Sequence, residues 1–280
     1  MKTGVARTAG PARRVSGVCL ALALAAALGA GCQAPQARVP PPEVVPDVAP
    51  GATAREVSLG ESVEGRPLTL HVFGEPGAGP AVFIFGGIHG DEPVGVALAE
   101  RLIGVLRERP ALSAGRTVAL LSCANPDGLA AGRRGNARGV DCNRNFPATN
   151  FKPAARNGPH PASEPETQAI LKALEMLRPA RVVSIHACPR GQHGVNYDGP
   201  AETLARAMAA GNGYRAFGTW FRPTPGSLGS YAGVDRGIAV ITLEVPRDLT
   251  AEAAWNENRE TLLAAIEGDA PLAPPAADTE

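Results

Sequence analysis

Two histidines and a glutamate stand at points where strands are expected to end. His89 and Glu92 lie three residues apart in G-G-I-H-G-D-E (residues 86–92), and His186 ends the apolar run V-V-S-I-H. A spacing of three brings two side chains to one side of a turn, so that an imidazole and a carboxylate can share a metal ion. Two His and one Glu form a ligand set of catalytic zinc sites, with the fourth position left for water. On spacing alone, the alternative of structural residues in a chance arrangement stays open.

A further carboxylate, Glu244, lies in the apolar stretch I-T-L-E-V-P (residues 241–246). Burial of an unpaired carboxylate costs several kcal/mol, so Glu244 requires a partner or a nearby cation.

Strands and helices alternate along the chain around these residues. Apolar runs predict strands at 81–86, 117–122, 182–186 and 238–245, and apolar periodicity predicts helices at 92–107, 163–177, 201–210 and one around Trp255 to Ile266. Ser163 and Glu166 are expected to form a capping box, and N-P-D-G at 125–128 is expected to form a turn. The order predicts an α/β fold with a mixed, mostly parallel central sheet and helices on both faces. In such sheets the site lies beyond the strand ends.

Composition excludes several classes of protein. The chain has 280 residues, of which 27 are basic, 27 acidic and 44% hydrophobic, which suffices for one sizeable domain. No run of Lys or Arg indicates a nucleic-acid partner, and five cysteines are too few for a disulfide scaffold. Nothing in the sequence indicates an obligate protein partner.

Residues 1–31 have the parts of a lipoprotein-type signal peptide. Four basic residues and no acidic one precede an apolar run at 18–28, small residues follow, and Cys32 comes next. The run is shorter than the ~20 residues of a transmembrane helix. We therefore expect export to the cell envelope, facing the periplasm or the exterior, and a membrane anchor through a lipid on Cys32. An ordinary signal peptide cut nearby is the alternative.

The exported chain divides by composition into three parts. Residues 32–54 are Pro-rich and are expected to form a tether. Residues 55–268 are expected to form the folded domain. Residues 269–280 are rich in Ala and Pro and are expected to be a disordered tail.

Several motifs together resemble the zinc carboxypeptidase family, and within it the bacterial murein peptide amidases. They are N-P-D-G, N-A-R-G-V-D-C-N-R-N-F-P at 136–147, N-Y-D-G-P-A at 196–201 and P-T-P-G-S-L-G-S-Y at 223–231. The resemblance runs from about Pro80 to Pro246. It implies a zinc peptidase or amidase with one Zn²⁺ per chain. It also implies a peptide or muropeptide substrate, cleaved between γ-D-glutamate and meso-diaminopimelate.

The resemblance also implies roles for individual residues. They are His89, Glu92 and His186 as zinc ligands, Glu244 as general base, Asp141 as hydrogen-bond partner of His89, Arg134 for the oxyanion, and Asn143 with Arg144 for a substrate carboxylate. Arg133 is adjacent to Arg134, which leaves a one-residue ambiguity. Digestive carboxypeptidases carry a tyrosine on a loop before the stretch at 223–231. Trp220 and Phe221 occupy that neighbourhood here, and Tyr231 comes after it.

Other titratable residues are weaker candidates. His160 and His71 are expected to be solvated, the latter on an edge strand, whereas His193 is a minor candidate for lining the cleft. Cys123, Cys142 and Cys188 remain after processing. One disulfide and three buried thiols both fit an exported protein.

Two other functions compete with wall-peptide hydrolysis. One is a zinc deacylase of small N-acyl amino acids, similar to succinylglutamate desuccinylase. The export signal and the Pro-rich tether favour the envelope enzyme over this alternative. The other is a non-catalytic module that binds wall peptides, which would have no need of Glu244 beside three metal ligands.

Overall fold

The computed structural model describes residues 54–75, 77, 79–218 and 224–268. Its first strand begins at Arg55 and its last helix ends at Glu267. The signal peptide with Cys32, nearly all of the tether, and the tail lie outside the described residues, as do Trp220 and Phe221, so those predictions stay predictions. No helix in the described ranges is long and apolar enough to cross a membrane.

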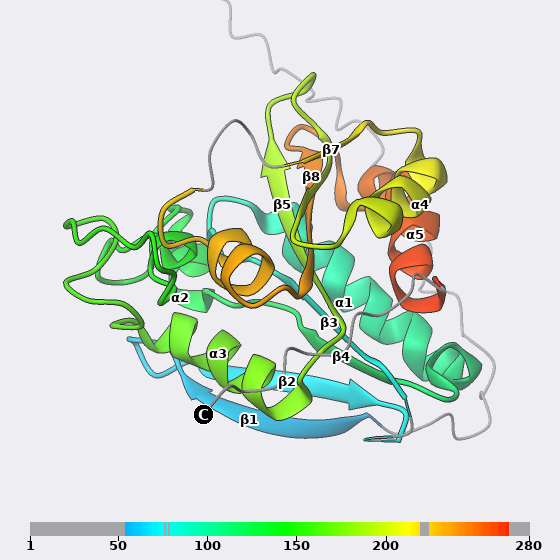
Figure 1. Ribbon diagram of the computed structural model, residues 1–280, viewed down its shortest axis with the longest axis horizontal. Coiled ribbons are helices and arrows are strands. Elements are labelled where there is room, and N and C mark those ends of the chain that lie inside the picture. Colours follow the sequence, from blue (N-terminus) through cyan, green and yellow to red (C-terminus); the bar gives the residue numbers. More distant parts are fainter. Residues whose placement is uncertain (1–53, 76, 78, 219–223, 269–280) are drawn as a thin grey trace, which may run out of the picture. The chain divides into compact units, whose positions relative to one another are not determined.

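One mixed sheet organises the described part of the chain. Its order is β1-β2-β4-β3-β5-β8-β6-β7 (Figure 1). The strands are β1 (Arg55–Glu61), β2 (Pro67–Phe73), β3 (Ala81–Gly86), β4 (Thr117–Leu121), β5 (Arg181–Cys188), β6 (Gly194–Asp198), β7 (Ala216–Gly218) and β8 (Ala239–Pro246). The central strands β4, β3, β5 and β8 are parallel, and antiparallel pairs flank them on both sides. The predicted fold class is confirmed.

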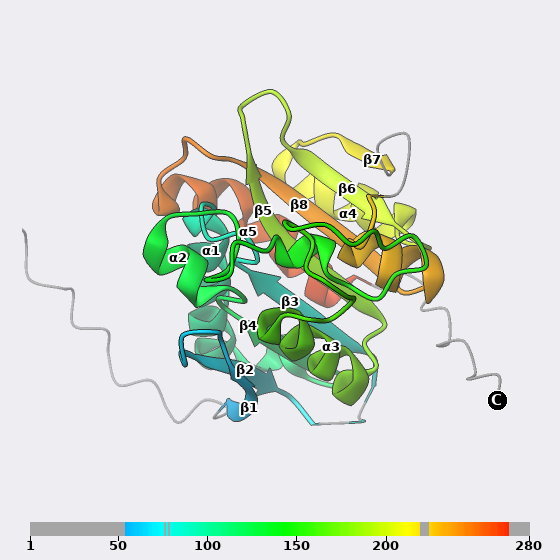
Figure 2. The same cartoon turned by 90° about the vertical axis from the view of Figure 1, so that its left-hand side faces the viewer.

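Helices cover both faces of the sheet. On one side lie α1 (Pro93–Glu108), α4 (Glu202–Asn212) and α5 (Ala251–Glu267), which share one hydrophobic core with the strands. On the other lie α3 (Pro165–Leu177) and a π-helical turn (Gly229–Asp235), which pack on a second core. Figure 2, viewed from this second side, shows α3 and the long loop before it in front of the strands.

Coverage on both faces explains why the central strands are continuous apolar runs. Every residue of β3, β4 and β5 is buried, as expected for parallel strands between two helical layers. Side chains alternate between faces along a strand. In β5, Val182 packs in the core on the α3 side, so His186, four residues on, faces the same side beyond that core. The apolar residues thus fix the register that aims His186 at the site.

Two local predictions were wrong. The expected turn at 125–128 is the start of a short helix, α2 (Pro126–Ala131), because the Asn125 side chain accepts the Gly128 amide and caps it. The expected capping box does not form. Glu164 is the residue before α3, and the Glu166 carboxylate accepts hydrogen bonds from Asn136 and from the Val63 amide, both far away in sequence. Long-range partners therefore displaced the local motif.

Candidate active site

The three predicted metal ligands converge on one point. His89 lies in the loop after β3, Glu92 precedes α1, and His186 lies in β5. The His89 Nδ1 atom is 3.0 Å from one Glu92 oxygen and 3.1 Å from His186 Nδ1, which is 3.1 Å from the other Glu92 oxygen. All three residues are buried, and one donor atom from each lies within 4.8 Å of the others. Two imidazole nitrogens and a carboxylate aimed at one another suit a zinc ion.

The outer ring nitrogens make the bonds that orient both imidazoles. His89 Nε2 lies 3.1 Å from Asp141 Oδ1, and His186 Nε2 lies 3.0 Å from the Ser184 hydroxyl. An ionised carboxylate only accepts, so His89 Nε2–H donates to Asp141, and in a neutral ring the Nδ1 lone pair would then face a metal ion bound in the cluster. Such partners fix the tautomer and orientation of metal-binding histidines.

Both carboxylates of this network are held in the ionised form. Burial opposes the ionisation of Glu92, but hydrogen bonds from His186 and His89 outweigh it and hold the pKa of that carboxyl far below its usual range. Burial likewise opposes the ionisation of Asp141, and its hydrogen bond with His89 helps to hold its pKa far below the usual range. An ionised carboxylate is the form that binds metal.

Backbone contacts from the residues on either side of α2 support the ligand loop. The Gly90 amide donates to the Arg134 carbonyl at 3.3 Å, and the Asn125 amide donates to the Gly87 carbonyl at 2.9 Å. A Cβ atom on Gly90 would lie 1.9 Å from the Gly128 carbonyl carbon. The N-P-D-G segment therefore acts as a close-packed support for the metal-ligand loop, and only glycine fits at position 90.

Arg134, rather than Arg133, faces the cluster. Its Nε donates to Asp141 at 2.9 Å, and its Nη1 lies 3.4 Å from Glu92 Oε1. Arg133 is exposed, and its guanidinium donates instead to the Ala137 carbonyl. Of these two adjacent arginines, only Arg134 lines the cavity, so Arg134 is the one placed to act there.

Glu244 lies beside His186 in the next strand. The two residues are paired in the parallel register of β5 and β8, so their side chains share one face of the sheet. Glu244 is half-buried and lines a cavity of about 340 Å³ together with the three clustered ligands. The acid in an apolar strand is thus explained by an open polar cavity in front of it.

Asn143 and Arg144 lie on the wall of the same cavity. Asp141 accepts the Asn143 amide at 3.0 Å, and the Asn143 side-chain oxygen accepts the Leu228 amide at 2.9 Å. Burial lowers the pKa of Arg144 from its ordinary value. Gly226 has a φ of +67°, and a Cβ there would lie 2.3 Å from the Arg144 carbonyl oxygen. The segment at 223–231 therefore packs directly against the Asn143–Arg144 pair.

Sequence reasoning gave no role to several residues of this site. Asn196, Asp198, Thr242 and Arg247 line the cavity, and Ser184 orients His186. Burial raises the pKa of Asp198 to about 6. The motif at 196–201 includes Asn196 and Asp198, and their spacing of two residues is the signal of a shared strand face that could have pointed to them. Arg247 carried no signal beyond its place three residues after Glu244.

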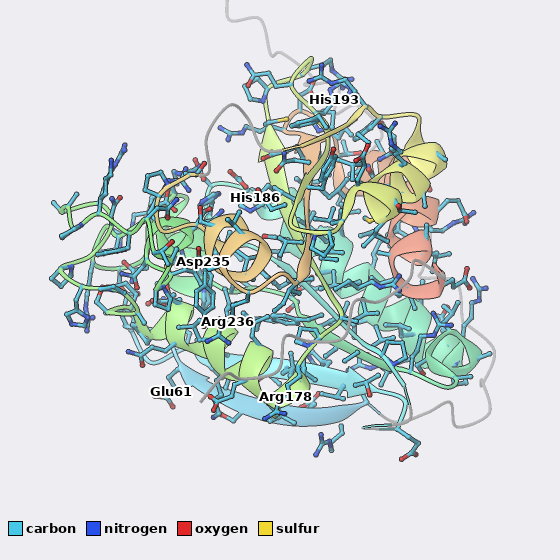
Figure 3. The ribbon with its side chains drawn as sticks, viewed as in Figure 1. Glu61, Arg178, His186, His193, Asp235 and Arg236 are labelled. Atoms are coloured by element: carbon cyan, nitrogen blue, oxygen red, sulfur yellow. The ribbon has the colours of Figure 1, made fainter. Side chains whose placement is uncertain are left out.

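The remaining histidines lie outside the cavity. His193 packs against the Tyr214 ring at 4.6 Å, and Figure 3 shows it on the β5–β6 connection, away from His186. His160 is exposed, as expected. His71 was wrongly expected on an edge strand. It lies on β2 between β1 and β4, and burial lowers its pKa.

The structure shows what Tyr231 and the three described cysteines contact. Tyr231 packs against an aromatic ring, and none of these three cysteines forms a disulfide. Tyr231 stacks on Phe146 with the ring centres 6.1 Å apart. Cys123, Cys142 and Cys188 are free thiols. Burial raises the pKa of Cys123 to about 11 and that of Cys188 to about 12, so both stay protonated at neutral pH.

Comparison with known proteins agrees with this geometry. The family model described as "Zinc carboxypeptidase" matches residues 50–197. Murein peptide amidase A of Escherichia coli is 34% identical over 218 residues, covering 70% of this chain and 83% of that protein. The chain belongs to the zinc carboxypeptidase family. As a member of that family, it is a hydrolytic enzyme.

Two further relatives show the extent of the similarity. Murein peptide amidase A of Vibrio campbellii is 29% identical over 232 residues, covering 77% of this chain and 88% of that protein. The crystal structure of murein-tripeptide amidase from Escherichia coli matches with a TM-score of 0.60 at 30% identity, over 77% of this chain and 91% of that one. Carboxypeptidase A of Helicoverpa armigera, at 19% identity, matches in fold with a TM-score of 0.63 over 76% of this chain and 67% of that one.

Proposed function

We propose that the protein is a zinc-dependent hydrolase of cell-wall peptides, which cleaves the amide bond between γ-D-glutamate and meso-diaminopimelate. The observation that carries the proposal is the convergence of His89, Glu92 and His186 in one cavity with Glu244. The similarity to murein peptide amidases supports the substrate class.

The metal would be held by Nδ1 of His89, Nδ1 of His186 and the Glu92 carboxylate, since these atoms face one another. When bound there, zinc would lower the pKa of a water molecule to about 7 and polarise the scissile carbonyl. Asp141 would keep the His89 lone pair aimed inward, and the Ala187 amide, which donates to Glu92 at 3.0 Å, would hold that carboxylate in place.

Glu244 would take the proton of the attacking water and deliver it to the leaving nitrogen. Its place beside His186 in the strand register supports this role. Arg134 would stabilise the negative charge that develops on the carbonyl oxygen, an effect of roughly 3–4 kcal/mol in comparable sites. Its guanidinium is partly exposed to the cavity and is held by Asp141.

Arg144 and Asn143 would bind a carboxylate on the leaving side of the amide. The planar guanidinium can hold a carboxylate with two parallel hydrogen bonds, which a lysine could not do. Diaminopimelate carries such a carboxylate next to the scissile nitrogen. Binding it would set the position of the amide against Glu244 and the metal centre.

Digestion of purified muropeptides, with products identified by mass spectrometry, tests the proposal. We expect free diaminopimelate-containing product from the zinc-loaded protein, none after chelation, and a loss of most activity in Glu244→Gln despite retained metal. Hydrolysis of N-acyl amino acids alone would favour the deacylase. Binding without turnover in the loaded protein would favour the non-catalytic module. Near-parental rates in Glu244→Gln would show that another residue is the base.

We further propose that the chain is exported and anchored through a lipid on Cys32. The support is the sequence at 1–32 and the envelope location of the proposed substrate. Cys32→Ser should abolish lipidation and release the protein from membranes after export, as read by fractionation. Equal solubility of both proteins would indicate an ordinary signal peptide instead.

A further inference from the structure

Three arginines line the cavity, and only two of them have a role in the proposed reaction. Arg134 faces the carbonyl, and Arg144 faces the leaving side. The third, Arg247, follows β8 directly, three residues beyond Glu244. Its side chain is 49% exposed, so the guanidinium is accessible to a ligand in the cavity.

The register of the strands places Arg144 and Arg247 at opposite ends of the cavity. Thr242 pairs with Asn196 of β6, and both line one end. Arg144 belongs to this end, because its carbonyl abuts Gly226, and the same loop continues to Gly229. A Cβ on Gly229 would lie 2.1 Å from the Asp198 carboxylate, on β6.

Arg247 lies on the other side of Glu244. Its amide donates to the Cys188 carbonyl at 2.8 Å, and Cys188 and Pro189 line this second end. At about 3.3 Å per residue, its Cα lies about 10 Å past that of Glu244, whereas Thr242 lies about 7 Å before it. A substrate that spans the cavity with its leaving side toward Arg144 therefore directs its acyl side toward Arg247.

The guanidinium is held over the cavity wall by two contacts. Its Nη2 donates to the Ala187 carbonyl at 3.3 Å and lies 3.9 Å from Glu92 Oε1. Glu92 is already shared by His89 and His186. The two contacts involve one nitrogen of a group with five N–H donors in a planar fork, which suits a carboxylate.

An anion site at the acyl end separates acyl residues that carry a free carboxylate from those that carry none. An α-linked acyl residue with an uncharged side chain has no free carboxylate. In a γ-linked glutamyl residue the α-carboxylate is free, four carbon–carbon bonds from the scissile carbonyl, or about 5 Å when extended. This distance fits between Glu244 and a long side chain reaching back from position 247.

We propose that Arg247 binds the free α-carboxylate of the acyl-side residue and so favours a γ-linked glutamyl residue over an uncharged acyl residue at that position. The inference rests on the proposed function, because it takes the leaving side of the amide to lie toward Arg144. It assigns to Arg247 a specificity role at the acyl end, separate from the carboxylate held at the leaving side.

The test compares two tripeptide substrates, L-Ala-γ-D-Glu-diaminopimelate and the same peptide with the glutamyl α-carboxylate amidated. We expect the zinc-loaded parent to prefer the free acid about tenfold in kcat/KM, mostly through KM, because the ion pair is half-exposed and screened. Arg247→Gln should turn over both peptides equally, and Arg247→Lys should keep part of the preference. Arg190→Gln is the matched control, since Arg190 lies nearby in a surface ion pair with Asp248 and should leave the preference unchanged.

Calorimetric binding of both peptides and elemental analysis accompany the kinetics. Tighter binding of the free acid to the parent, lost in Arg247→Gln with metal retained, supports the inference even if turnover is slow. Equal losses for both peptides together with metal loss would show that Arg247 only supports Glu92 and would overturn it. Indifference of the parent to amidation in both kinetics and binding would also overturn it. Failure to hydrolyse either peptide, with the binding preference intact, would count against the proposed reaction alone.

Discussion

Asp141→Asn should weaken metal binding without unfolding the protein. In the parent, one Asp141 oxygen accepts from His89 Nε2 at 3.1 Å and from the Asn143 amide at 3.0 Å, and the other accepts from Arg134 Nε at 2.9 Å. All three partners present N–H groups, and an amide side chain has only one acceptor atom. The substitution must therefore place its NH₂ group against at least one donor.

Either orientation of the new amide has a definite cost. If the NH₂ group faces Arg134, one charge-assisted hydrogen bond is lost. If it faces His89, the ring must take its proton on Nδ1, the atom that faces Glu92 and His186. Loss of such outer partners typically weakens metal affinity 10–100-fold, which corresponds to about 1.4–2.8 kcal/mol.

Competition with a chromogenic chelator measures this affinity. Asp127→Asn is the matched control. Asp127 is also buried, but it accepts from Ser62 and the Glu64 amide in a separate network, so its loss should lower the free energy of unfolding and leave zinc affinity unchanged. An unaltered zinc affinity in Asp141→Asn would refute the argument that Asp141 fixes the donor atom of His89.

Three further outcomes follow from the structure. Burial raises the pKa of Asp198 to about 6, against about 3.9 in the unfolded chain. Ionisation of Asp198 should therefore lower the free energy of unfolding by about 2–3 kcal/mol as the pH rises from 4 to 7. In urea titrations Asp198→Asn should lack this loss, and parallel pH profiles of the two proteins would contradict the prediction. Gly90→Ala should lower that free energy by about 1–3 kcal/mol through its clash with Gly128, whereas Gly104→Ala, with open space around it in α1, should be neutral or stabilising. Arg144→Ala should raise KM for γ-D-glutamyl-diaminopimelate peptides, as should amidation of the leaving-side carboxylate; equal turnover of free and amidated substrates would assign Arg144 a structural role.

The parts of the site that depend on strand ends were predictable from the sequence. Continuous apolar runs identify β3, β5 and β8 because these strands are largely buried, and polar residues at or just beyond their carboxyl ends meet at one edge of the sheet. This is why His89, His186 and Glu244 could be expected together. The edge strand β1 is mostly exposed and reads R-E-V-S-L-G-E, so it lacks the pattern that identifies a buried strand.

Contacts between distant segments were not predictable in this way. Glu166 matches a local capping pattern, but its carboxylate accepts a hydrogen bond from Asn136 instead. The two residues are far apart in sequence, so local spacing could not predict this contact. His71 lies in a stretch with the pattern of a strand, but that pattern does not show whether the strand lies at the edge of the sheet or between two other strands. Arg247 is an ordinary exposed residue in the sequence. Only the register of β8 against β5 and β6 shows that it lines the cavity opposite Arg144.

The most direct test of the central claim is a crystal structure of the zinc-loaded protein, with anomalous data collected at the zinc absorption edge. We predict a single anomalous peak per chain, within bonding distance of Nδ1 of His89, Nδ1 of His186 and the Glu92 carboxylate, and no such peak in His186→Ala. A peak at another group of side chains, or unchanged zinc occupancy in His186→Ala, would contradict the proposed metal centre.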